Sequence, residues 1–144
     1  MRSVFRWLTS VLFVAIVVQV ALAGYGAFNA VHKAESASVS KKTIEDGFSA
    51  HMALGYVIVL VMLLLLVVAV VGRLGEASVR LSAALVILGV LQAILGMASE
   101  TTPGIGPLHA INALAIYAVS GLLAHRTWTE YRRASAPQPD AATR

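Results

Sequence analysis

The chain has 144 residues, of which 58% are hydrophobic and 12% charged, and its mean hydropathy is +0.81. Soluble domains are nearer about 45–50% apolar and about 25% charged, so a water-soluble fold of this length could not bury so much apolar surface. The lack of cysteine excludes disulfides, thiolate metal sites and cysteine nucleophiles, and the net charge of +4 does not indicate nucleic acid because the basic residues lie at the ends of apolar runs.

Four apolar runs follow one another along the chain, at about residues 7–28, 48–72, 81–98 and 108–125. Each is near the roughly 20 residues that a helix needs to cross a bilayer. Polar connections at residues 29–47, 73–80 and 99–107 separate them. We therefore predict an all-α fold, a four-transmembrane-helix bundle in residues 1–133, followed by a disordered cytoplasmic tail in residues 134–144.

The distribution of basic residues predicts the orientation of the bundle. Cytoplasmic loops of membrane proteins are enriched in lysine and arginine. One side would carry Arg2, Arg6, Arg73, Arg80, Arg126, Arg132, Arg133 and Arg144, and the other only Lys33, Lys41 and Lys42. Both termini are therefore expected to be cytoplasmic, in a multi-pass protein of a plasma membrane of bacterial type.

The first run also has features of a secretory signal peptide, because two arginines precede it and Ala21-Leu22-Ala23 lies just before Gly24. We prefer a retained helix. The run is long for the apolar core of a signal peptide, and cleavage would leave three helices.

The four predicted helices form two similar pairs. The first helix of each pair carries a glutamine followed by a glycine, and the second opens with a histidine and a small residue one turn later. These residues are Gln19, Gly24, His51 and Gly55 in the first half, and Gln92, Gly96, His109 and Ala113 in the second. Since the first and third helices run in the same direction, a two-fold axis along the membrane normal would point His51 and His109 at each other.

Two facing imidazoles favour a heme site, with His51 and His109 as the axial metal ligands of heme b. Small residues beside the ligands, at Gly55 and Ala113, would leave room for the flat ring. Gly24 and Gly96 would let the other helices approach its edge, and Gln19 and Gln92 could bond ring substituents or the second nitrogen of a ligand histidine. Three simpler interpretations stay open: histidines bonded to carbonyls near the interface, glycines that serve helix packing, and glutamines that bond across helices.

Other polar residues are less suited to take part in this heme site. His125 lies about 24 Å from His109 along the predicted helix, so we expect it to cap the last turn. His32 is expected in an exposed loop. The lysines of the outer connection could contact heme propionates, although a solvated loop is the preferred interpretation.

The segments Leu91-Gln-Ala-Ile-Leu-Gly96 and Pro107-Leu-His109-Ala-Ile-Asn-Ala113 resemble the third and fourth helices of one half of heme A synthase. The chain also resembles a family of uncharacterised small four-helix bacterial membrane proteins. The first resemblance implies that His51 and His109 are axial heme ligands. It does not imply synthase activity, because Phe48 stands where that enzyme has a catalytic glutamate and its outer-loop cysteine pair is missing. We therefore expect no catalytic residues.

The sequence thus predicts a small integral-membrane b-type heme-binding protein with bis-histidine ligation, acting in electron transfer or heme handling. Its expected partners are membrane lipid, a redox or heme-handling membrane protein, or a second copy of the chain. The alternative is a non-catalytic accessory or assembly subunit of a larger membrane complex, without its own cofactor. A third class, a transporter or quinone-site protein, has no broken span or charged midplane in its favour.

Overall fold

The computed structural model describes residues 1–36 and 39–136, which form four long helices and no strand. The helices are α1 (Arg2–Ser36), α2 (Lys41–Val71), α3 (Glu76–Thr101) and α4 (Gly106–Ser135), and the short 3-10 helix η1 (Pro103–Ile105) precedes α4. Each long helix has the length and apolar composition needed to cross a membrane. The predicted all-α four-helix fold is confirmed.

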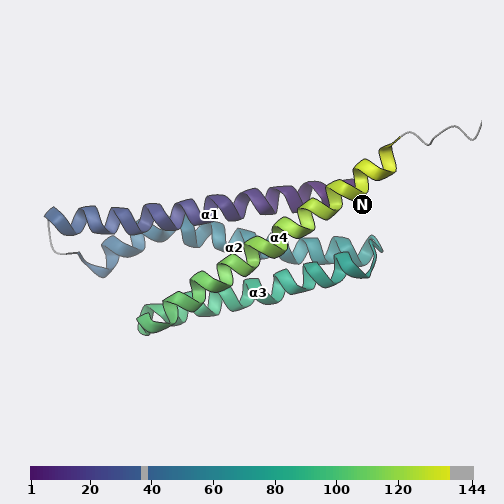
Figure 1. The fold of residues 1–144 in the computed structure, drawn as a ribbon. Helices are drawn as coiled ribbons and strands as arrows, with labels where there is room; N and C mark the ends of the chain where they lie inside the picture. Colours follow the sequence, from purple (N-terminus) through teal and green to yellow (C-terminus); the bar gives the residue numbers. More distant parts are fainter. Residues whose placement is uncertain (37–38, 137–144) are drawn as a thin grey trace, which may run out of the picture.

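The helices form an antiparallel ring in which consecutive helices pack against each other and α4 closes the ring against α1. Within the described residues, the diagonal pairs α1–α3 and α2–α4 do not pack against each other. Figure 1 shows the N-terminus and the last turns of α4 at one end of the bundle, with the last turns of α1 and the first turns of α2 at the other. We call these the arginine end and the lysine end, after the basic residues that each carries.

The helices continue beyond the apolar runs that predicted them. With 35 residues, α1 rises about 52 Å, well beyond a hydrocarbon core of about 30 Å. Residues 29–36 and 41–47, expected in a connection, are helical because alanine, lysine and glutamate favour helices in water too. Similarly, α4 includes Ala134 and Ser135, which the sequence predicts in the tail, and residues 137–144 lie outside the described residues.

Local signals fix where the helices begin and end. Ser40 is the N-cap of α2, and its Oγ accepts a hydrogen bond from the backbone N–H of Thr43 at 3.2 Å. The tight turn between α2 and α3 needs two left-handed residues, Arg73 with φ 47° and Gly75 with φ 91°. In this turn the N–H of Leu74 bonds to the carbonyl of Ala69, which satisfies an otherwise unpaired carbonyl at the end of α2.

The apolar core occupies the half of the bundle nearer the arginine end. Its members come from all four helices: Phe5, Leu12, Ile16, Ile58, Met62, Leu65, Val68, Ala69, Leu85, Ile116 and Leu123. From there towards the lysine end, the buried described residues are Gly26, Gly47, Gly89 and Asn112. Large apolar side chains are therefore fully buried at one end, whereas at the other end the fully buried described residues are small or polar and larger side chains such as Phe48 are partly buried.

The predicted orientation can be tested directly. Reporter fusions placed after Arg73 and after Arg132 should report a cytoplasmic position, and fusions near Lys41 and Pro103 the opposite side, because the arginines concentrate at one end. An external signal after Arg132 would contradict both the orientation and the number of spans.

Candidate functional site

His51 on α2 and His109 on α4 meet across the interior of the bundle. Their ring centroids are 6.4 Å apart, and the ring planes are inclined by 59°. Both side chains are partly buried. Since the backbones of α2 and α4 do not pack against each other, the two histidines span a diagonal of the ring of helices.

In the first helix pair, His51 and Gln19 are joined by two hydrogen bonds. The ring Nδ1 of His51 lies 3.0 Å from the backbone carbonyl oxygen of Gln19, and Gln19 Nε2 donates to the carbonyl of His51 at 2.8 Å. The carbonyl can only accept, so Nδ1 carries the hydrogen. The other nitrogen, Nε2, receives no hydrogen bond from the described residues.

The second helix pair repeats the first of these bonds. His109 Nδ1 lies 3.1 Å from the backbone carbonyl oxygen of Gln92, the equivalent of Gln19. The Gln92 side chain differs, because its Nε2 lies 3.0 Å from His109 Nε2 and donates to it. The two halves therefore share one device, in which a histidine N–H is held by the carbonyl of a glutamine on the preceding helix.

This device is also found in histidines that bind metal ions. A histidine that donates Nδ1–H to a carbonyl is fixed in one tautomer and ring orientation, with the lone pair on Nε2. It is equally a way to satisfy a polar side chain among apolar helices. The hydrogen bonds alone therefore agree both with the heme interpretation and with the structural one that the sequence left open.

The glycines of the repeat have different surroundings. A Cβ added at Gly96 would lie 3.3 Å from Cε1 of His109, so this glycine makes room for the ring on the Gln92 carbonyl. A Cβ at Gly55 would lie 3.1 Å from Nε2 of Gln19, so Gly55 makes room for the glutamine. Gly24 has no atom within 4 Å of such a Cβ and does not take part in these contacts. Ala113, one turn after His109, is partly buried.

Two residues contribute contacts that were not among the predicted site residues. Asn112 is buried, and its Nδ2 donates to Gln92 Oε1 at 2.6 Å and to the carbonyl of Leu88 at 2.9 Å. The sequence signal was an amide in an apolar helix beside a candidate ligand. Phe48 stands edge-on to His51, with ring centroids 6.1 Å apart, and a Cβ at Gly26 would lie 2.9 Å from its ring. In the sequence, Phe48 is notable only because it stands at the position of a catalytic glutamate.

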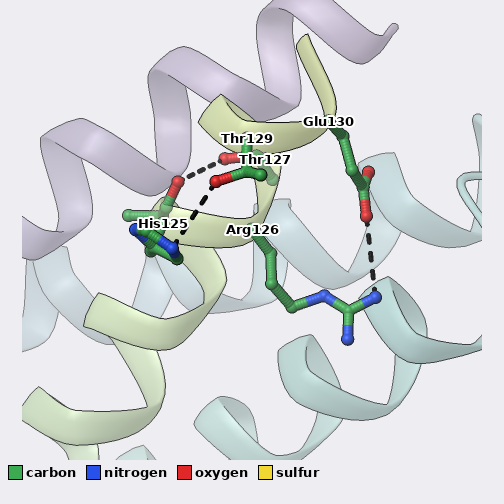
Figure 2. A network of polar contacts seen from close by, with 6 residues as sticks. His125, Arg126, Thr127, Thr129 and Glu130 are labelled. Carbon is green, nitrogen blue, oxygen red and sulfur yellow. Dashed lines mark hydrogen bonds and ion pairs between the residues drawn. The ribbon is translucent and has the colours of Figure 1, made fainter. Parts of the chain in front are cut away.

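The remaining histidines lie apart from this pair. Near the arginine end, His125 Nε2 is 3.5 Å from Thr129 Oγ1, within a group that includes the Arg126–Glu130 ion pair (Figure 2). The prediction that His125 caps the last turn is wrong, because α4 continues to Ser135. His32 is exposed as expected, but it lies on α1 rather than in a loop, 4.0 Å from Glu35.

Fold and site together define a membrane-type four-helix bundle with a pair of partly buried histidines held by backbone carbonyls. The chain belongs to DUF6220, a family of unknown function, whose profile matches residues 19–99. The matched segment starts at Gln19 and includes His51 and Gln92, whereas His109 lies beyond it. No curated protein and no solved structure matches the chain significantly.

Proposed function

We propose that the chain is a small integral-membrane heme b protein, with His51 and His109 as axial ligands, that acts in electron transfer or heme handling in a bacterial plasma membrane. The observation that carries the proposal is the approach of the two rings, whose centroids are 6.4 Å apart with each Nδ1 held on a helix carbonyl. Heme iron takes its four other ligands from the porphyrin, so two imidazoles complete its coordination.

The separation of the rings suits this ligation. Iron–nitrogen bonds of about 2 Å, with each ring nitrogen about 1 Å from its ring centre, place two axial imidazole centres about 6 Å apart. The inclination of 59° between the ring planes is compatible, because ligation of one iron by two imidazoles does not require their planes to be parallel. The centroid separation is therefore compatible with one iron atom between the rings, once the Gln92 amide has released His109 Nε2.

Two features of the surroundings support a bound group. In the lysine-end half of the bundle, the fully buried described residues are glycines and Asn112, whereas larger apolar side chains such as Phe48 are only partly buried. In addition, Gln19 Oε1 is buried and accepts no hydrogen bond from the described residues. A buried acceptor without a donor costs about 1–3 kcal/mol, so a ligand or water that donates to it would be favoured there.

The residues of the site have separate tasks in this proposal. His51 and His109 would hold the metal, and the carbonyls of Gln19 and Gln92 would orient the rings. The Gln92 amide now bonds His109 Nε2, so it would have to release that nitrogen for ligation. Asn112, which donates to Gln92 Oε1, helps to set the position of that amide. The heme itself would supply one-electron chemistry when bound.

A second function, an accessory or assembly subunit without cofactor, rests on the same Gln92–His109 bond. That bond and the other bonds between the glutamines and histidines give partners to three of the four ring nitrogens and to the amide nitrogens of Gln19 and Gln92 without any ligand. Interhelical bonds of this kind stabilise membrane bundles by about 0.6 kcal/mol each. In this case the polar layer would serve only to join α1 to α2 and α3 to α4.

Titration of the heme-free protein with heme b separates the two functions. We expect saturable binding that ends at one heme per chain, because the pair supplies one set of axial ligands. The matched control is the variant that carries both His51→Ala and His109→Ala. Binding that does not saturate, or that is unchanged in the double variant, would support the accessory role.

A further inference from the structure

The arginine end contains an aromatic cage that is separate from the histidine pair. The guanidinium carbon of Arg6 lies 3.6 Å from the ring centroid of Tyr131, 4.8 Å from that of Trp128 and 6.0 Å from that of Trp7. The indole N–H of Trp128 donates to Ser10 Oγ at 2.8 Å, which fixes the cage between α1 and α4. Cation–π contacts of this kind orient a guanidinium without neutralising its charge.

Arg6 differs in its partners from two other arginines of the same end. Arg80 pairs with Glu76 at 3.3 Å, and Arg126 pairs with Glu130 at 3.6 Å. Arg6 has no carboxylate partner among the described residues, and its Nε is buried without a hydrogen bond from them. A partly buried cation held by rings is a site at which an anion is favoured.

A shallow groove on α1 leads away from the cage towards the membrane interior. It is lined by Trp7, Ser10, Val11, Val14 and Ala15, all on α1, and is open along its length. These residues repeat at helical spacing along one face of α1, and Trp7 belongs both to the groove and to the cage. From Trp7 to Ala15 the groove covers about 12 Å of helix rise, beginning at the charged end.

We infer that this face of α1 binds one acidic phospholipid, with the phosphate on Arg6 and an acyl chain along the groove. The cage and the groove follow one another as the headgroup and acyl chain of a phospholipid do in a leaflet. The cage would hold the anion at the interface, and the apolar groove points into the hydrocarbon. Arginine suits the phosphate because its planar donors match phosphate oxygens. Charge complementarity favours this occupant, since acidic lipids gather where a membrane protein carries its basic residues.

Native mass spectrometry of the full-length protein in detergent tests the inference, with phosphatidylglycerol and phosphatidylcholine as probes. The wild type should bind phosphatidylglycerol about tenfold more tightly than phosphatidylcholine, because the choline ammonium of the second lipid offsets the charge of its phosphate beside Arg6. Arg6→Gln should abolish this preference. Arg80→Gln is the matched control, because it removes the same charge at the same end from an arginine that is already paired.

The groove is tested by Val11→Trp, which fills it without changing the charge. Val11 is 57% exposed, so the bundle can accept the larger side chain, and binding of both lipids should weaken while the preference remains. If the Arg6→Gln protein does not fold, the inference is tested with Val11→Trp and Arg6→Lys instead, because neither substitution removes the positive charge. An equal loss of preference in Arg6→Gln and Arg80→Gln would show general charge attraction and overturn the inference. So would lipid binding that Val11→Trp leaves unchanged.

Discussion

Replacing either His51 or His109 with alanine should lower the affinity for heme by at least about 100-fold, or leave high-spin heme that binds carbon monoxide. The two rings face each other at 6.4 Å, so each variant removes one of two axial ligands and opens one coordination position. The measurement is the visible spectrum of each purified variant, reduced and then exposed to carbon monoxide.

The matched control for these variants is His125→Ala. His125 belongs to the polar group at the arginine end, where it contacts Thr129, and lies sixteen positions from His109 on the same helix (Figure 2). Its replacement should leave the heme spectrum unchanged. Loss of heme in His125→Ala together with its retention in His51→Ala would show that the ligands are assigned wrongly.

The second large effect is expected at Gly96. A leucine there places a Cβ 3.3 Å from the His109 ring, so the ring would be pushed away from the Gln92 carbonyl that orients it. Because loss of an orienting bond to a metal ligand typically costs about 10- to 100-fold in affinity, heme binding should weaken by that factor. Heme titration of the purified Gly96→Leu protein measures the change.

Gly24→Leu is the matched control for Gly96→Leu. Both glycines follow a glutamine of the repeat, but a Cβ at Gly24 meets no atom within 4 Å. Heme affinity should therefore stay at the wild-type value in Gly24→Leu. Equal weakening in the two variants would mean that the substitutions act through general helix packing and not through the histidine ring.

Periodicity and composition were enough to predict four membrane-type helices, because a run of about 20 apolar residues has few alternatives to a spanning helix. They could not predict the helix ends. Water-exposed turns, such as those of residues 29–36, add no apolar signal, and their helicity depends on backbone hydrogen bonds and on residues such as Ala30 and Lys33. The continuation of α4 past His125 has the same cause.

The part of the candidate site that the sequence could predict is the part in which the two halves carry equivalent residues. Two histidines in equivalent contexts predicted a facing pair, and His51 and His109 do lie together. The glycines were harder, because the role of a glycine depends on which side chain crosses it. The spacing of Gln92 and Gly96 is four residues, which places both on one helix face, whereas Gln19 and Gly24 are five apart and point differently. Ala23, four residues after Gln19, is the true counterpart of Gly96 in this register.

The central claim is that one iron atom is held between His51 and His109, and the most direct measurement is the reduced spectrum of the wild-type protein with and without carbon monoxide. The protein would be purified from cells supplied with heme precursor. We expect a sharp reduced-state alpha band that carbon monoxide does not shift, because both axial positions are filled by imidazole. A folded, helical protein without heme absorbance, or heme that binds carbon monoxide readily, would contradict bis-histidine ligation.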